Sequence, residues 1–350
     1  MATSTTILNV GILGASGYTG AELVRLLAHH PNVAIRAITA DRKAGQGMET
    51  VFPHLGGVAL PKLTTIEDTD LAALDAVFLG LPHGTTQDVV NALPEHLKVI
   101  DLSADFRLRD LATYKQWYGH DHRAPQLQKE AIYGLTEHAR DAIAAARIVA
   151  CPGCYPTASM LPLIPLLQAG LISSDDIIID AKSGVSGAGR AEKEASLFAE
   201  VSEGIHAYGI ANHRHAPEIE QELTVAAGKP ITVAFTPHLV PMNRGILATI
   251  YVRLAAGAAA EDLHGHLAAA YGDEPFVRVL PQGAAPATRH VRGSNHCLIG
   301  VFPDRLPGRA ILVSAIDNLV KGAAGQAVQN FNLVAGLPEI TALQQEPLFP

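Results

Sequence analysis

The chain has 350 residues with a formal net charge of −8, and 48% of them are apolar. This length favours two domains with a substantial core, while the acidic balance and the lack of any Lys/Arg run argue against a nucleic-acid partner. No apolar stretch is long enough to span a bilayer or resembles a signal peptide, and three cysteines make no disulfide framework, so we expect a cytoplasmic protein with no membrane partner.

Short runs rich in β-branched residues alternate with amphipathic segments through the first half of the chain. The predicted strands cover residues 7–13, 34–39, 76–81, 99–103 and 147–150. This alternation predicts an α/β fold with a Rossmann-type, doubly wound parallel sheet. A helix over residues 21–30, with leucines on one side, joins the first two strands and stops at Pro31.

A glycine-rich loop, GASGYTG at residues 14–20, separates the first strand from this helix. Gly14 and Gly17 allow a tight turn and close approach of a pyrophosphate, whose charge is stabilised by the positive end of the helix. Gly20 allows close packing of the helix on the sheet. We therefore expect a dinucleotide site formed by Gly14, Ser16, Gly17, Tyr18, Thr19 and Gly20. A glycine-rich turn without a ligand is the alternative.

The residues after the second strand bear on the choice of coenzyme. Arg42 and Lys43 lie where such folds contact the adenine ribose of the coenzyme, and their positive charges suit a 2′-phosphate. Asp41 keeps NAD open as the alternative, because a carboxylate there binds a free 2′-hydroxyl. We favour NADP. Further along, the segment DLSADFR ends in Arg107 at the carboxyl end of a parallel strand, where this cation could hold a phosphate.

Residues 151–157, CPGCYPT, form a predicted sharp turn between the strand 147–150 and a helix from Ala158 onward. Cys154 then lies at a helix N-terminus, whose positive end stabilises a thiolate. Four interpretations stay open on the local pattern: a nucleophile, a buried structural cysteine, a redox pair with Cys151, and part of a zinc site.

After Cys154 the strands alternate with fewer helices and cover residues 177–181, 231–235, 247–254, 276–280, 297–302 and 310–314. We expect a second α+β domain on a mixed or antiparallel sheet. A last helix should start near Asp317, as N-cap, and end by Gly336. The expected domains are residues 1–153 for NADP binding, 154–316 for catalysis, substrate binding and oligomerisation, and 317–350 for a C-terminal helix and tail that return to the first domain.

Two polar segments of the second half could carry chemistry. The loop GVSGAGR ends in Arg190 and suits close backbone approach to nicotinamide or a substrate anion, although an ordinary turn is the alternative. In NHRHAPEI, Pro217 lies in the first turn of a predicted helix, so His215 lies beside its positive end. This position keeps an imidazole neutral and able to take and return a proton. In a chain with 16 histidines, a surface or core residue is the alternative.

These segments belong to an ordered series of motifs. They are GASGYTG (14–20), LPHG (81–84), DLSADFR (101–107), YGLTE (133–137), PGCYPT (152–157), SGVSGAGR (183–190), HRHAPEI (213–219), FTPHLVPMNRGIL (235–247) and DNLVKGAAGQAVQN (317–330). With them the chain resembles, nearly end to end, the N-acetyl-gamma-glutamyl-phosphate reductases of arginine biosynthesis. The turn of this family usually reads Asn-Pro-Gly-Cys, and Cys151 replaces the Asn here.

The resemblance implies NADPH-dependent reduction of N-acetyl-gamma-glutamyl phosphate to N-acetylglutamate semialdehyde and phosphate, by a homo-oligomer, a tetramer or dimer. It implies Cys154 as the nucleophile, through a thioester, and His215 as acid/base. We assign phosphate to Arg107, a carboxylate to Arg190 or Arg244, and substrate contact to His213. Ser186, Gly187 and Asn318 are expected to orient nicotinamide, and no metal is expected.

Other functions remain open at this stage. Aspartate-semialdehyde dehydrogenase and a reductase of carrier-bound aminoadipyl phosphate share the mechanism and differ in substrate. A regulator that binds NADP without catalysis is the alternative from a different class.

Overall fold

The computed structural model describes residues 6–349. Residues 1–5, part of the N-terminus in which no signal peptide is expected, and residue 350 lie outside the described residues. The chain forms two compact units, Met1–Pro152 with Ala323–Gln344, and Gly153–Gly322 with Gln345–Pro350. The domain limits 1–153, 154–316 and 317–350 remain a prediction.

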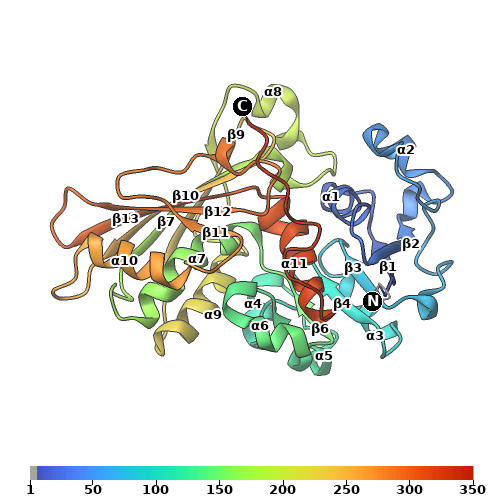
Figure 1. Cartoon of the computed structure of the whole chain (residues 1–350), viewed down its shortest axis with the longest axis horizontal. Helices are drawn as coiled ribbons and strands as arrows, with labels where there is room; N and C mark the ends of the chain where they lie inside the picture. The colour runs from blue at the N-terminus through green and yellow to red at the C-terminus, as the bar shows by residue number, and fades with distance from the viewer. Residues whose placement is uncertain (1–5, 350) are drawn as a thin grey trace, which may run out of the picture. The chain divides into compact units, whose positions relative to one another are not determined.

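The first unit is built on a six-stranded sheet with the order β2-β1-β3-β4-β6-β5, in which every pairing is parallel (Figure 1). Its strands are β1 (Leu8–Leu13), β2 (Val33–Thr39), β3 (Ala76–Leu79), β4 (Lys98–Asp101), β5 (Ile132–Tyr133) and β6 (Ile148–Ala150). The predicted doubly wound sheet is confirmed. The chain order reverses between β1 and β3, so ligands are expected at the carboxyl ends of these two strands.

The helices of this unit are α1 (Tyr18–Leu27), α2 (Met48–Val51), α3 (Thr86–Ala92), α4 (Leu111–Tyr118), α5 (Pro125–Glu130), α6 (Thr136–Ala145) and α11 (Gly325–Val334). The C-terminal helix α11 packs against α1, α6 and β4. Its Phe331 ring lies 5.3 Å from that of Phe78 in β3, and both side chains are buried. A segment from the end of the chain therefore completes the core of the first unit.

The second unit contains a seven-stranded mixed sheet with the order β11-β12-β13-β10-β7-β9-β8. Its strands are β7 (Ile177–Gly184), β8 (His206–Ala207), β9 (Val233–Val240), β10 (Ile246–Arg253), β11 (Val277–Val279), β12 (Cys297–Pro303) and β13 (Arg309–Ile316). The pairs β7–β9 and β11–β12 are parallel and the others antiparallel, which confirms the predicted mixed sheet.

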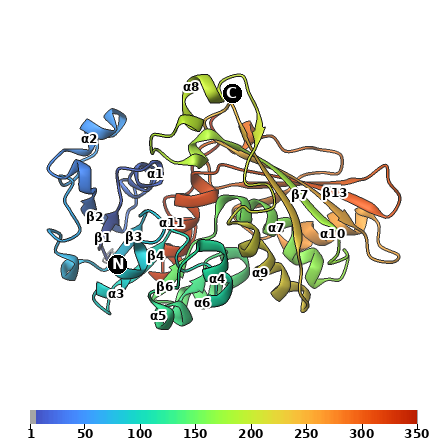
Figure 2. The same cartoon turned by 180° about the vertical axis from the view of Figure 1, so that it is seen from behind.

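The helices of the second unit are α7 (Cys154–Gln168), α8 (Phe198–Val201), α9 (Ala216–Ala227) and α10 (Ala260–Ala270). Figure 2 shows α7 and α10 beside strands β7 and β13. Helix α7 packs against β10 and β13, and α9 and α10 pack against α7. Because alternate residues of β10 are buried, one face of this sheet supplies the core beneath α7.

Several element limits differ from the sequence prediction. Helix α1 begins at Tyr18, within the glycine-rich segment 14–20 and before the predicted start at Ala21, and α7 begins at Cys154 rather than at Ala158. Strand β9 runs on through Pro237 to Val240. The two-residue strands β5 and β8 are too short to give an alternating pattern, so the sequence did not indicate them.

The last predicted helix is a π-helix over its first part, Val320–Ala324, before α11 begins. The Asp317 carboxylate accepts the backbone N–H groups of Leu319 and Val320, as expected of an N-cap. A π-helical turn within a helix is rare and is frequent at functional sites.

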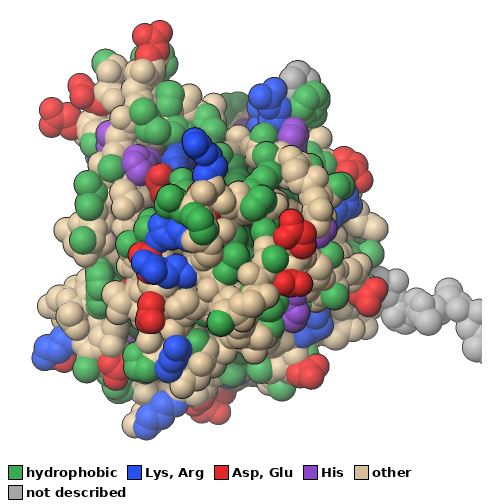
Figure 3. All heavy atoms as spheres, turned by 90° about the vertical axis from the view of Figure 1, so that its left-hand side faces the viewer, with side chains coloured by type: hydrophobic (Ala, Val, Ile, Leu, Met, Phe, Trp, Pro, Cys, Tyr) green, Lys and Arg blue, Asp and Glu red, His purple; other side chains and the backbone are tan. Residues whose placement is uncertain are grey.

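Among residues 6–349, no helix combines the length and the apolar character needed to cross a membrane. On the face shown in Figure 3, Lys and Arg side chains lie among Asp and Glu side chains.

Candidate functional site

The glycine loop of the first unit is held tightly at its two ends. Gly14 has a φ of +89°, and a Cβ there would lie 2.6 Å from the Gly80 carbonyl oxygen. A Cβ on Gly20 would lie 2.6 Å from Cα of Ala15, so only glycine lets α1 pack this closely. At Gly17 the nearest neighbour of a Cβ is 3.8 Å away. Gly14 and Gly20 thus shape the loop, while Gly17 leaves space beside it.

The start of α1 has the properties of an anion site. Its N-cap is Gly17, which has no side chain to cap the first turn, and no acidic residue lies in that turn. At the end of β2, Thr39 accepts the Gly14 N–H with its hydroxyl at 3.2 Å and the Ala15 N–H with its carbonyl at 2.8 Å. The first turn of α1 has N–H groups without an acceptor inside the helix, as an anion-binding helix start requires. The loop also carries Ser16, Tyr18 and Thr19.

Arg42 and Lys43 lie in the short 3₁₀ helix Asp41–Lys43, directly after β2. All three of its side chains are exposed. The structure thus leaves both cations accessible beside the end of β2, as a site for a 2′-phosphate requires.

The segment after β4 contains two buried carboxyl groups with opposite behaviour. Desolvation raises the pKa of Asp101 to about 7, against hydrogen bonds from the Ser103 backbone and hydroxyl. Desolvation also acts on Asp105, but hydrogen bonds from His83, Gly84 and Thr86 outweigh it and hold its pKa below the usual value.

Arg107 is buried in the first unit, with 7% of its surface exposed. Its Nε donates to the Cys151 carbonyl at 2.8 Å and its Nη2 to the Leu102 carbonyl at 3.0 Å. These bonds fix the backbone that leads into the cysteine turn. A role of Arg107 in binding phosphate remains a prediction.

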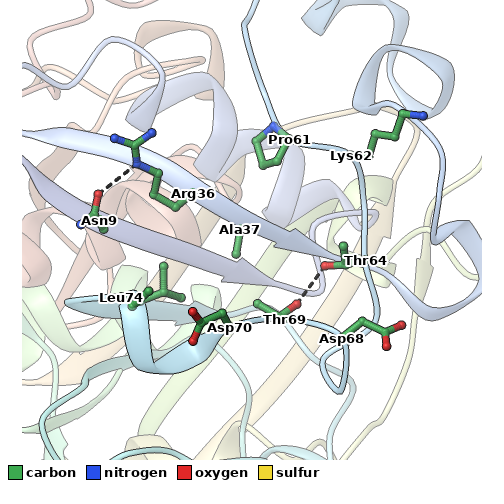
Figure 4. A pocket seen from close by; sticks show the side chains of 11 residues that line it. Asn9, Arg36, Ala37, Pro61, Lys62, Thr64, Asp68, Thr69, Asp70 and Leu74 are labelled. Atoms are coloured by element: carbon green, nitrogen blue, oxygen red, sulfur yellow. Dashed lines mark hydrogen bonds between the residues drawn. The ribbon is translucent and has the colours of Figure 1, made fainter.

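One cavity of the first unit, of about 440 Å³, has none of the predicted site residues in its lining. Figure 4 shows Arg36 hydrogen-bonded to Asn9, with Lys62 on the same side and Asp68 and Asp70 opposite. Asn9 is the second residue of β1, whereas the glycine loop follows the last residue of that strand. The lining carries charges of both signs and matches no part of the predicted chemistry.

Cys154 is the first residue of α7 and is half-buried. The residue before it, Gly153, donates its N–H at 2.7 Å to Glu218 Oε1 in the first turn of α9, and Glu218 is only 1% exposed. On another side, a Cβ on Gly322 of the π-helix would lie 2.7 Å from Cβ of Cys154. The buried carboxylate of Glu218 and the close approach of Gly322 thus fix the position of Cys154.

Cys151 is more deeply buried than Cys154. It is 1% exposed, and burial raises its pKa to about 12. The Asn330 amide donates to its sulfur at 3.7 Å. A buried thiol that resists ionisation is a poor redox partner, so the redox-pair interpretation loses its support. Among residues 6–349, no group of three or more His, Cys, Asp or Glu is arranged to hold a metal ion.

His215 lies directly before α9, with Pro217 in the first turn, as predicted. Its ring centroid lies 5.8 Å from that of Tyr155, the neighbour of Cys154 in the chain, and α7 packs against α9. The His213 ring lies 4.7 Å from that of His215. The second unit thus brings Cys154, His215 and His213 into one region.

A second network joins three loops of this unit. Asn318 accepts the Gly245 N–H at 2.7 Å and donates to the Ser186 hydroxyl at 2.9 Å. The neighbouring Asp317, which is fully buried, accepts the Gly293 N–H at 2.7 Å and pairs with Arg244 Nη1 at 3.4 Å.

The predicted residues of the SGVSGAGR segment belong partly to this network. A Cβ on Gly187 would lie 3.8 Å from the Asn318 amide nitrogen. Arg190 stands at the exposed end of the same segment. The sequence therefore predicted Ser186, Arg244 and Asn318 as site residues, but not their partners Gly245 and Gly293 or the bonds that join them.

Two residues that hold the site were not singled out from the sequence. Glu218 could have been noticed as a charged residue next to the apolar Ile219 on the buried side of a helix. Gly322 gave no such signal, because its importance comes from its contact with Cys154, far away in the chain. Asp317 was expected only as an N-cap, and its pairing with Arg244 was not foreseen.

Comparison with known proteins gives a consistent result. Residues 9–146 match the family described as "Semialdehyde dehydrogenase, NAD binding domain", and residues 154–318 match "Semialdehyde dehydrogenase, dimerisation domain". The N-acetyl-gamma-glutamyl-phosphate reductase of Rhodospirillum rubrum is 64% identical over 348 residues, covering 98% of this chain and 99% of the relative. A probable chloroplastic N-acetyl-gamma-glutamyl-phosphate reductase of Arabidopsis thaliana is 60% identical, covering 98% and 86%.

Solved structures share the fold at low sequence identity. An aspartate semialdehyde dehydrogenase II of Vibrio cholerae, complexed with ASA, has a TM-score of 0.71 at 18% identity and covers 95% of this chain and 99% of its own. An aspartate semialdehyde dehydrogenase of Candida albicans with NADP has a TM-score of 0.70 at 19% identity, covering 94% and 99%.

Proposed function

Since the chain belongs to the N-acetyl-gamma-glutamyl-phosphate reductase family, we propose that it reduces N-acetyl-gamma-glutamyl phosphate to N-acetylglutamate 5-semialdehyde with NADPH and releases phosphate. We further propose that this reaction serves arginine biosynthesis. The single observation that carries the proposal is that Cys154 and His215 lie at the starts of two helices that pack together, Cys154 as first residue of α7 and His215 directly before α9. The identity of the substrate is inferred from the names of the relatives.

The first unit supplies a fitting coenzyme site. Gly14 and Gly20 shape the loop and Gly17 leaves room for a pyrophosphate beside the start of α1, where Ser16, Tyr18 and Thr19 add further contacts. The exposed Arg42 and Lys43 suit the 2′-phosphate of NADP(H). The coenzyme, when bound, supplies the hydride that reduces the acyl carbon.

Cys154 performs the covalent chemistry. Its thiolate, favoured at the start of α7, attacks the acyl carbonyl carbon, the C–O bond to phosphate breaks, and a thioester forms. After the carbonyl carbon has received a hydride, the C–S bond of the thiohemiacetal breaks. This releases the aldehyde and restores the thiolate.

His215 manages the proton in this sequence. Its imidazole gives a proton to the oxygen that becomes negative when the thioester is reduced. It takes the hydroxyl proton back when the thiohemiacetal collapses, so the acid and base are both restored. Its ring lies beside that of Tyr155, the residue next to Cys154.

The charged groups of the substrate have candidate partners. We propose Arg244, held by the buried Asp317, for the carboxylate, with Arg190 as the alternative. Ser186, Gly187 and Asn318 are proposed to orient nicotinamide. Arg107 is proposed for phosphate, although its bonds to two backbone carbonyls favour a structural role, and His213 is considered separately below.

The experiment is an assay of purified chain in the reverse direction, with N-acetylglutamate semialdehyde, phosphate and NADP⁺. Reduction of NADP⁺ is expected with this aldehyde and much less with aspartate semialdehyde, because the pocket must reward the acetamido group. The Cys154→Ser variant should lose at least about 1,000-fold in kcat, since a hydroxyl is a far weaker nucleophile than a thiolate at neutral pH. A preference for aspartate semialdehyde would overturn the substrate assignment.

Alkylation separates an enzyme from a regulator that only binds NADP. We expect stoichiometric labelling of Cys154 by iodoacetamide at neutral pH, and protection by the acyl phosphate. The buried Cys151 is the internal control and should stay unlabelled. Labelling of Cys154 no faster than a free thiol would favour the regulator.

We also propose a homo-oligomer, dimer or tetramer, and a cytoplasmic location. The match of residues 154–318 to a domain described by dimerisation supports the former. Light scattering of the purified chain would measure the oligomer directly.

A further inference from the structure

The His213 side chain is enclosed by aromatic rings. Its centroid lies 5.8 Å from that of Tyr155, 5.4 Å from that of Tyr208 and 5.4 Å from that of Phe235, all in edge-on contact. The Tyr208 hydroxyl donates to the Tyr155 hydroxyl at 3.1 Å, which donates to the His238 carbonyl at 3.1 Å. This enclosure fixes the orientation of the His213 imidazole.

Within this enclosure, His213 Nδ1 accepts the backbone N–H of His215 at 3.1 Å. A nitrogen that accepts must present its lone pair, so the ring carries its proton on Nε2. Burial lowers the pKa of His213 to about 4, and the neighbouring Arg214 acts in the same direction. The ring therefore stays neutral near pH 7, and its Nδ1 remains a hydrogen-bond acceptor at that pH.

The bond matters because of where His215 stands. His215 is the N-cap of α9, with φ −82° and ψ −15°, and its N–H precedes the hydrogen-bonded turns of the helix. Rotation about these two dihedrals would swing its ring relative to Tyr155 and hence to the adjacent Cys154. A displacement of about 1 Å in such a group costs on the order of 100-fold in rate.

From this geometry we infer that His213 is a positioning residue, whose neutral imidazole accepts the N–H of His215 and so fixes the backbone from which the acid/base ring projects. This replaces the expectation that His213 contacts the substrate. The inference rests on the proposed function for the role of His215, but the hydrogen bond itself does not.

Three substitutions distinguish the effect of the hydrogen-bond acceptor from the effect of the imidazole ring as a whole. His213→Asn places an oxygen close to the position of Nδ1, and Asn side chains commonly accept the N–H two residues ahead. His213→Gln places its amide near the position of Nε2 instead, and His213→Leu removes the acceptor while keeping apolar contacts. If the Leu variant does not fold, the comparison of Asn with Gln carries the test.

The kinetic readout is the split between kcat and KM. We expect the Leu and Gln variants to lose about 10- to 100-fold in kcat, with KM for the aldehyde nearly unchanged, and the Asn variant to recover most of the loss. A raised KM at unchanged kcat would overturn the inference in favour of substrate contact. Equal losses in Asn and Gln would overturn it as well.

A second readout needs no substrate. Hydrogen exchange of the His215 amide, resolved to single residues by mass spectrometry, should accelerate at least about tenfold in the Leu and Gln variants and not in Asn, because a lost hydrogen bond exposes the amide. Unchanged exchange would overturn the inference even in an active enzyme. An inactive wild-type chain with this exchange pattern would instead overturn the proposed function alone.

Discussion

The two units build their proposed sites in different ways. In the first unit, the glycine loop is shaped by close backbone contacts, of Gly14 with Gly80 and of Gly20 with Ala15. In the second unit, Cys154 is held by residues far along the chain, because the Gly153 N–H donates to Glu218 and Gly322 lies close to the Cys154 side chain. The glycines of the coenzyme half are neighbours in the sequence and form a readable motif, whereas the supports of the catalytic half are scattered along the chain and form none.

Gly322→Ala tests the catalytic half, and it should have the largest effect among the substitutions that keep the thiol. The added Cβ would lie 2.7 Å from Cβ of Cys154, so either the π-helix or the thiol residue must move. We expect kcat to fall at least about 100-fold, with slower alkylation of Cys154. The measurement combines steady-state kinetics with the alkylation rate.

Gly265→Ala is the matched control for this change. Gly265 lies in the middle of α10 with open space around a Cβ, and alanine favours the helix there. It should keep full activity. If Gly322→Ala is as active as Gly265→Ala, the contact between Gly322 and Cys154 does not determine the position of the thiol.

The coenzyme half is tested by replacing both Arg42 and Lys43 with alanine. Loss of charge-assisted bonds to a 2′-phosphate should lower kcat/KM for NADPH by about 10-fold or more. The value for NADH should stay nearly constant, because NADH has no such phosphate. The ratio of the two values is the measurement, and an equal loss with both coenzymes would contradict the assignment.

A smaller effect is expected on stability, from Asp101→Asn in the first unit. Because the pKa of Asp101 is raised from 3.8 to about 7, the folded chain keeps a proton that the unfolded chain has lost. Stability therefore falls as pH rises from about 4 to about 7, by up to about 1.4 kcal/mol per pH unit. The amide removes this loss, so the free energy of unfolding should increase at pH 8 and change little at pH 4.

Denaturant titrations at the two pH values would measure this difference. Asp105→Asn is the control with the opposite sign, since its pKa is lowered and its ionised form is stabilised by His83, Gly84 and Thr86. That variant should lose stability at pH 8. A gain of stability in both variants at pH 8 would mean that burial alone decides whether removal of the charge stabilises the chain.

The same contrast explains what sequence reasoning could find. The parallel sheet followed from the alternation of strands and helices, and Cys154 from its turn before a helix. The sequence pattern predicts the start of α7 four residues too late, because it assigns Pro156 to the turn. Proline in fact fits the first turn of a helix. The partners of Asp317 could not be predicted, since nothing in its local sequence indicates Arg244 or Gly293.

The C-terminal helix α11 has a consequence for synthesis of the protein. The first unit needs Ala323–Gln344, and Phe331 fills the core beside Phe78. On a ribosome the first 152 residues emerge long before this helix does, at about 5–20 residues per second. The nascent first unit must therefore wait some tens of seconds with an uncovered apolar surface, and during this delay it is open to chaperones and to aggregation.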